Sequence, residues 1–130
     1  MLAMRLRAIA IAVLLVAGCS DDPPEIRQLM YTPNAGLVGT MATINGTVAF
    51  TDSDGDISQS QLELFDPTGA GALTSPMPIM NVNQGPIGSV DFSIMFTPNL
   101  DGNWHFDVWI IDLQGRPSNK LNGVIRVSQP

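Results

Sequence analysis

Apolar and polar residues alternate with a period of two along most of the chain after residue 25. This period places every second side chain on the same face of an extended strand, so that one face is apolar and the other polar. Six segments show the alternation, and a seventh, interrupted by proline, fits only the edge of a sheet. The seven segments are 26–32, 41–51, 61–66, 77–82, 89–97, 103–112 and 121–128.

The alternation also predicts which side chains form the core. In the three longest segments the inward residues are Ala42, Ile44, Gly46, Val48, Phe50, Val90, Phe92, Ile94, Phe96, Trp104, Phe106, Val108 and Ile110. Twelve glycines and ten prolines supply turns between the strands, and no window has the spacing of an amphipathic helix. With 130 residues the chain has room for one core. These features predict an all-β fold, an antiparallel sandwich of about seven strands.

Several short motifs occur in a familiar order: 44–50 (INGTVAF), 52–57 (DSDGDI), 102–112 (GNWHFDVWIID), Gly115 and 118–119 (SN). This arrangement resembles the immunoglobulin-like, PKD- or cadherin-like domains of bacterial surface and periplasmic lipoproteins. The resemblance implies an immunoglobulin-like β-sandwich over residues 26–130. It also implies a role as a spacer, an adhesive module or a subunit of an envelope assembly.

The N-terminus has the layout of a secretory signal. Two basic residues, Arg5 and Arg7, precede an apolar stretch, 8–17, that is far shorter than the about 20 residues of a transmembrane helix. The stretch ends in Val-Ala-Gly-Cys at residues 16–19, which resembles a lipobox. The resemblance implies removal of residues 1–18, diacylglycerol on the sulfur of Cys19 and acylation, as with palmitate, of its new N-terminus. An ordinary signal peptide with a chance cysteine is the alternative.

Residues 19–25 then form an acylated cysteine and a short polar tether that contains Pro23 and Pro24. We therefore expect a lipid-anchored protein of the cell envelope, with the membrane as a partner through Cys19. The second residue of the mature chain is Ser20 and not aspartate. By the sorting rule of Gram-negative lipoproteins this resembles an outer-membrane protein.

The charge of the chain excludes one class of partner. The net charge is −6, and without Arg5 and Arg7 the mature chain has four basic and twelve acidic residues, or −8. Nucleic-acid binding requires clustered Lys and Arg, so no nucleic-acid partner is expected. A single cysteine also excludes a disulfide within the chain.

The sharpest candidate site is the acidic segment 52–56. Asp52, Asp54 and Asp56 are spaced so that their carboxylates can converge on a hard cation such as Ca²⁺. Antiparallel order can bring Asp112 to the same end of the sandwich, and cadherin-like domains collect calcium ligands at such loop ends. The alternative is a turn in which the Asp side chains bond their own backbone and Gly55 supplies a positive φ.

Trp109 and Ile111 form a second candidate, since both point away from the predicted core. An exposed apolar pair on a central strand can mark an interaction surface for an envelope protein or a surface ligand. The alternative is that segment 69–88 covers the pair. His105 and Asp107 share their face, but no nucleophile elbow accompanies them.

The sequence therefore predicts a non-catalytic, membrane-anchored structural or protein-interaction module. A calcium-dependent adhesive or ligand-binding module is the first alternative, and an envelope enzyme is the second. No cofactor other than Ca²⁺ is expected.

Overall fold

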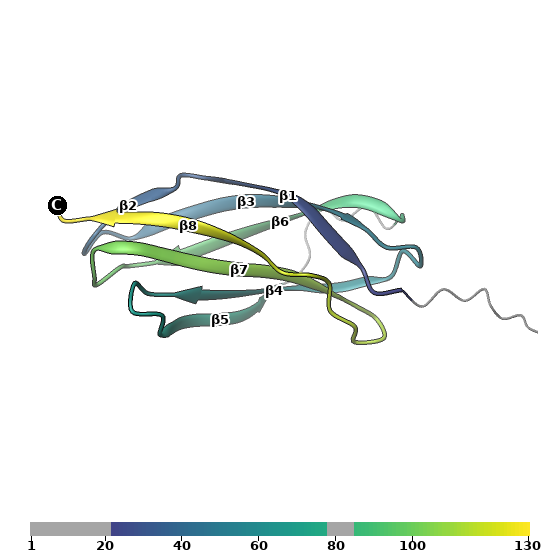
Figure 1. Ribbon diagram of the computed structural model, residues 1–130. Helices are drawn as coiled ribbons and strands as arrows, with labels where there is room; N and C mark the ends of the chain where they lie inside the picture. The colour runs from purple at the N-terminus through teal and green to yellow at the C-terminus, as the bar shows by residue number, and fades with distance from the viewer. Residues whose placement is uncertain (1–21, 78–84) are drawn as a thin grey trace, which may run out of the picture.

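The computed structural model describes residues 22–77 and 85–130 (Figure 1). Every regular element in this part of the chain is a strand, and no helix in it could span a membrane. The strands are β1 (Glu25–Thr32), β2 (Ala35–Leu37), β3 (Ala42–Thr51), β4 (Ile57–Phe65), β5 (Gly71–Met77), β6 (Ile87–Phe96), β7 (Gly102–Asp112) and β8 (Leu121–Ser128). The predicted all-β fold is confirmed.

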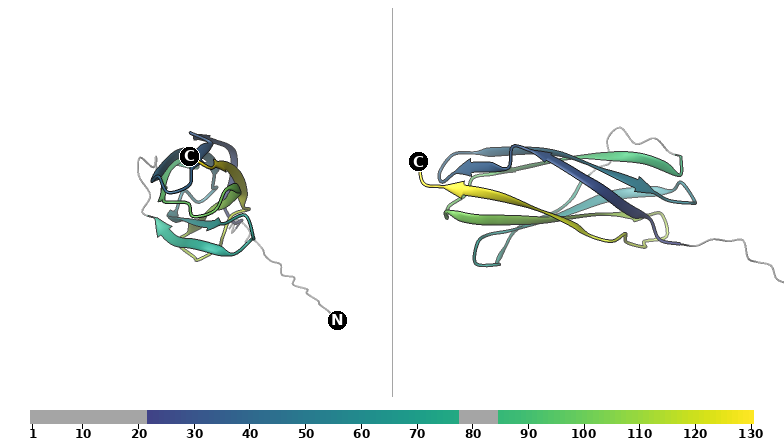
Figure 2. Two further views of the ribbon diagram at one scale, coloured as in Figure 1. Left: turned by 90° about the vertical axis from the view of Figure 1, so that its left-hand side faces the viewer. Right: turned by 45° about the horizontal axis from the view of Figure 1, so that its top comes forward.

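The strands form two sheets that face each other (Figure 2). One sheet has the order β1-β3-β6, and the other has the order β2-β8-β7-β4-β5. Neighbouring strands are antiparallel except for β2, which runs parallel to β8. The chain leaves the first sheet after β1 and joins the second at β2, with Pro33 and Asn34 between them. The architecture is an immunoglobulin-like β-sandwich.

Eight strands are described where the sequence predicted about seven. Strand β2 was missed because its three residues are too few to show a period of two. Strand β4 begins at Ile57, earlier than predicted, because an irregularity between Ile57 and Gln59 interrupts the alternation. Strand β5 escaped prediction because residues 71–74 are exposed on both faces. Of the predicted segment 77–82, only Met77 is described, and residues 78–82 lie outside the described residues.

The predicted inward faces of β3, β6 and β7 form the core. Of their inward residues, only Gly46 and Phe96 are partly rather than fully buried. Gly46 lies opposite Phe92 in the first sheet, and Gly123 lies opposite Phe106 in the second. A Cβ atom on either glycine would fall within 2.5 Å of the facing ring. The two rings meet between the sheets with centroids 5.7 Å apart, so each glycine makes room for an aromatic ring that joins the sheets.

The sandwich has two distinct ends. The tether end comprises the start of β1, residues 85–87 and the loops 52–56 and 113–120. The far end comprises the loops 38–41, 66–70 and 97–101. The described chain enters at the tether end, at the start of β1, and the C-terminus lies at the far end (Figures 1 and 2).

Candidate functional site

Three connections in the described residues share a five-residue pattern with Asp first and Gly fourth: 52–56, 66–70 and 112–116. In each loop the side chain of the first Asp accepts hydrogen bonds from the backbone N–H groups of the third and fifth residues. Its carbonyl accepts a bond from the glycine N–H, and the glycine has a positive φ. The first Asp therefore closes the loop, as the sequence-based turn alternative expected for Asp52 and Gly55.

In the loop 52–56 the first carboxylate is buried. Asp52 is 2% exposed, and its Oδ2 atom accepts the N–H of Asp56 at 3.0 Å. Its Oδ1 atom accepts the N–H of Asp54 at 3.4 Å. Both carboxylate oxygens of Asp52 therefore accept backbone N–H groups of the loop and hold its conformation.

Asp112 is equally buried, at 1% exposure. Its Oδ1 atom accepts the N–H groups of Gln114 at 3.0 Å and Arg116 at 2.8 Å. Its Oδ2 atom accepts Nε–H of Arg116 at 3.0 Å, so the arginine binds back onto the carboxylate that shapes its own loop. Sequence reasoning did not select Arg116. Arg116 directly follows the glycine of its Asp-x-x-Gly motif, as Asp56 follows Gly55.

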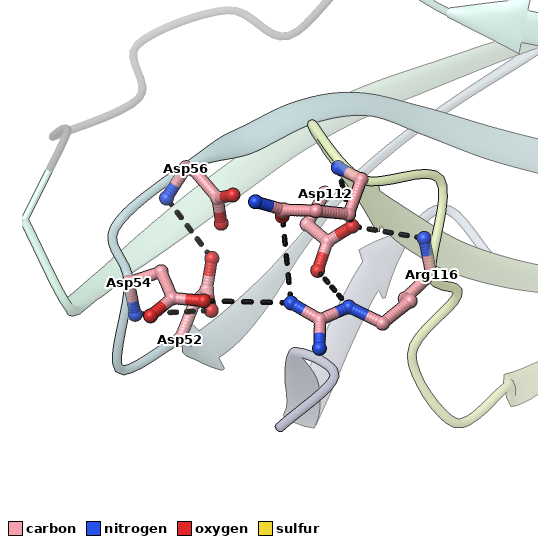
Figure 3. Close-up of polar contacts among 6 residues, drawn as sticks. Asp52, Asp54, Asp56, Asp112 and Arg116 are labelled. Atoms are coloured by element: carbon pink, nitrogen blue, oxygen red, sulfur yellow. Dashed lines mark hydrogen bonds and ion pairs between the residues drawn. The ribbon is translucent and has the colours of Figure 1, made fainter. Parts of the chain in front are cut away.

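The structure brings the loops 52–56 and 112–116 side by side (Figure 3). The N–H of Leu113 donates to the carbonyl of Asp56 at 2.9 Å. Arg116 reaches across, with Nη2 at 3.4 Å from Oδ2 of Asp54. Arg116 thus links the carboxylates of Asp54 and Asp112, one from each loop.

The carboxylates of Asp52, Asp54 and Asp56 converge. One oxygen of each lies within 4.8 Å of the others, so this trio forms a candidate cation site within the described residues. Asp112, the fourth predicted ligand, lies beside the trio but has Arg116 bonded to it. Its role in the structure is to hold its own loop and the guanidinium.

Within the described residues, Asp56 is the member of the trio with a carboxylate oxygen that lacks a hydrogen bond. Its Oδ1 atom is buried and has no hydrogen-bond partner in the described part of the chain. The neighbouring carboxylate of Asp52 raises the pKa of Asp56 above its ordinary value of 3.8, because a proton on Asp56 allows a hydrogen bond between the two. Burial and the charges of Asp52, Asp112 and Asp54 act in the same direction. Either a proton or a bound cation would therefore offset the negative charge of Asp56 in this cluster.

Trp109 and Ile111 lie on the outer face of the five-stranded sheet and are half-buried. The Nζ atom of Lys120 lies 4.2 Å from the centroid of the Trp109 ring, in cation–π geometry. Ile111 forms a bridge with Pro117. Strand β5, which belongs to the segment suggested as a cover, extends the sheet beyond β4, and residues 78–84 of that segment lie outside the described residues.

His105 and Asp107 share that outer face, as the alternation predicted. The His105 ring stacks on Phe65, with centroids 4.9 Å apart and planes 17° apart. Asp107 stands directly opposite Glu63 on β4. Stacking therefore accounts for the position of the His105 ring. Cys19, the predicted acylation site, lies outside the described residues.

The chain matches no protein-family model, and no curated protein sequence matches it. Its fold is similar to that of a CARDB domain from Pyrococcus furiosus, solved in complex with di-metal ions (TM-score 0.51, 12% identity, covering 85% of this chain and 99% of that one). It is also similar to a PKD domain of an M14-like peptidase from a Thermoplasmatales archaeon (TM-score 0.52, 21% identity, 83% and 98%). A superoxide reductase from Ignicoccus hospitalis has a comparable TM-score of 0.52 with 8% identity, over 79% and 82% of the two chains. At these identities the likeness shows the fold.

Proposed function

We propose that the chain is a lipid-anchored protein of the cell envelope whose domain is a non-catalytic structural or protein-interaction module. One observation carries the proposal: the lipobox-like residues 16–19 are followed, after only residues 20–24, by the first strand of an immunoglobulin-like sandwich. A folded module placed that close to an acylated cysteine suits a component held at a membrane surface. The presence of Ser20 after the cysteine favours the outer membrane in a Gram-negative cell.

Metabolic labelling with an alkyne analogue of palmitate tests the anchor. We expect label on the full chain and partition into the detergent phase, with both lost in Cys19→Ser. Ser20→Ala is the matched control, because it changes the neighbouring residue and leaves the acylated sulfur. Equal membrane partition of Cys19→Ser and the unsubstituted chain contradicts the proposal.

The outer face around Trp109 and Ile111 is the proposed contact for an envelope protein or surface ligand. Two half-buried apolar side chains on a central strand support this choice. A photo-crosslinker at Gln61, which pairs with Trp109, is expected to join a stoichiometric partner in the intact envelope. A crosslinker at Ala49, on the outer face of the other sheet, is the control. Equal crosslinking from both faces contradicts the assignment.

A calcium-dependent adhesive or ligand-binding module is the second candidate, favoured by the buried Oδ1 atom of Asp56. A hard cation accepts carboxylate oxygens, and the CARDB domain of similar fold was solved with metal ions. Millimolar Ca²⁺ is then expected to raise the melting temperature. At a tenfold excess of Ca²⁺ over Kd, the free energy of unfolding should increase by about 1.4 kcal/mol. Asp56→Asn should abolish the shift, whereas Asp66→Asn, in the far-end loop, should preserve it. An unchanged melting temperature contradicts calcium binding.

The non-catalytic character is tested through His105, the residue that would take part in catalysis if the chain were an envelope enzyme. We expect no hydrolysis of envelope glycans, peptides or esters by the purified chain, since stacking on Phe65 accounts for the ring. An activity that His105→Ala removes, and that an equally folded Asn103→Ala variant retains, would overturn this part of the proposal.

A further inference from the structure

We propose that the tether end is a membrane-contact surface, held against the lipid headgroups by the segment that anchors the chain. The inference rests on the proposed acylation of Cys19 and adds an orientation to it. In this orientation the loops 52–56 and 113–120 face the bilayer, and the far end points away from it.

The first support is the short distance between the anchor and a fixed point of the domain. The side chain of Asn119 accepts the N–H of Ile26 at 2.8 Å and donates to its carbonyl at 3.0 Å. Asn119 thus replaces a neighbouring strand and fixes the start of β1 to the loop before β8. Seven peptide units separate Cys19 from Ile26, which is about 25 Å when fully extended. The tether end is therefore kept near the lipid surface.

The second support is the pair of aliphatic side chains at this end. Leu113 is 71% exposed and Ile87 is 70% exposed, the highest values among the large apolar side chains of the described residues. Both flank the acidic loop: the N–H of Leu113 bonds Asp56, and Ile87 pairs with Thr51. Aliphatic side chains that project from adjacent loops can enter the headgroup layer, which removes their surface from water.

The third support is charge, which selects the kind of lipid. Asp54 and Glu25 are exposed at this end, close to the buried Asp52 and Asp112. The guanidinium of Arg116, paired with Asp54 and Asp112, and the exposed Lys120 of the loop 113–120 offset only part of this negative charge. Carboxylates are repelled by anionic lipid, whereas zwitterionic phosphatidylethanolamine has no net charge to repel them. The surface therefore fits a zwitterionic leaflet.

The far end also has exposed apolar residues, with Met41 at 62% and Met95 at 59%. It is separated from the tether end by the length of β7, whose 11 residues span about 35 Å. With the tether end on the bilayer, these residues cannot reach the same surface. Met41 is therefore a matched control position for Leu113.

The experiment uses the full chain, acylated in a bacterial host and reconstituted into phosphatidylethanolamine–phosphatidylcholine vesicles. Thioether formation leaves no free thiol at Cys19, so Leu113→Cys or Met41→Cys supplies one site for an environment-sensitive dye. A headgroup-attached nitroxide is expected to quench the dye at position 113 about threefold more strongly than at position 41, because only position 113 enters the headgroup layer. Replacing half of the lipid with anionic phosphatidylglycerol should weaken that quenching.

A second reporter tests the aliphatic contact itself. With the dye on Ser53→Cys, the added pair Leu113→Asn and Ile87→Asn is expected to reduce quenching while the melting temperature stays unchanged. Mass spectrometry of Cys19 separates the two proposals. An acylated chain with equal quenching at positions 113 and 41 overturns the orientation alone. A chain without acyl groups that stays off the vesicles overturns the anchor and the orientation together.

Discussion

The loops 52–56 and 66–70 have the same backbone pattern but lie at opposite ends of the sandwich. In each, an aspartate accepts two backbone N–H groups and a glycine with positive φ turns the chain. The far-end loop is exposed and ends in Ala70, whereas the tether-end loop buries Asp52 and ends in Asp56. The third loop of this kind ends in Arg116.

This difference separates structural from available carboxylates. The aspartate in the first position closes all three loops in the same way, so its presence does not indicate a bound ligand. The fifth position gives its backbone N–H to the first Asp in all three loops, and its side chain differs: Asp56, Ala70 or Arg116, of which Arg116 also bonds the first carboxylate. Asp52 is needed for the turn itself, so Asp54 and Asp56 are the residues that would give the tether end cation binding.

The largest expected effect is that of Asp112→Ala. This substitution removes three hydrogen bonds to a buried carboxylate and leaves the guanidinium of Arg116 without it. We expect a loss of about 3 kcal/mol in the free energy of unfolding, measured by urea denaturation. A loss below that of Asp66→Ala would show that the loop 112–116 does not need its first carboxylate.

Asp52→Ala is expected to have the next largest effect, about 2 kcal/mol, because two backbone N–H groups lose a buried acceptor. Asp66→Ala is the matched variant. Its loop is exposed, so water can replace the lost acceptor and the loss should be clearly smaller. Equal losses in urea denaturation would mean that burial does not distinguish the two loops.

The fold could be predicted to a large extent because burial repeats along the strands. Every second residue of β3, β6 and β7 is inward, and sequence alone shows this period. Strands β2 and β5 could not be predicted in the same way. Strand β2 is a three-residue addition to β8, and the described side chains of β5 are exposed, so neither has a buried face to leave a pattern.

The candidate site was only partly predictable. The convergence of Asp52, Asp54 and Asp56 follows from local spacing, which sequence reasoning can use. Arg116 was missed because its contact with Asp54 joins residues 62 positions apart. The repeat of Asp-x-x-Gly at 52–55 and 112–115 was the available signal, since it indicates two similar loops with opposite charges in the fifth position.

Asp56→Asn tests the fifth position directly and should stabilise the domain at neutral pH. The amide can donate a hydrogen bond to Asp52, as a protonated Asp56 would, and it removes one negative charge from the cluster. We expect a gain of about 0.5–1 kcal/mol in urea denaturation without divalent cations, the scale of a partly exposed charge pair. Ala70→Asp, the reciprocal change in the far-end loop, should bring no gain. A loss on Asp56→Asn would mean that the ionised carboxylate stabilises the loop.

The smallest effect is the pH dependence of the two loops, which should have opposite signs. The hydrogen bond from the Thr68 hydroxyl, with backbone N–H groups, lowers the pKa of Asp66 below 3.8, so its stabilisation is present above pH 3.8 and is lost as pH falls through the lowered pKa. The raised pKa of Asp56 means that the folded state holds the proton more tightly, so stability falls as pH rises from 3.8 through that pKa. The check is the melting temperature measured from acid to neutral pH. The curve of Asp66→Asn should differ in slope from that of the unsubstituted chain only below pH 3.8. The curve of Asp56→Asn should differ from it only above pH 3.8. Parallel curves for both variants would remove the electrostatic distinction between the loops and leave burial as their only difference.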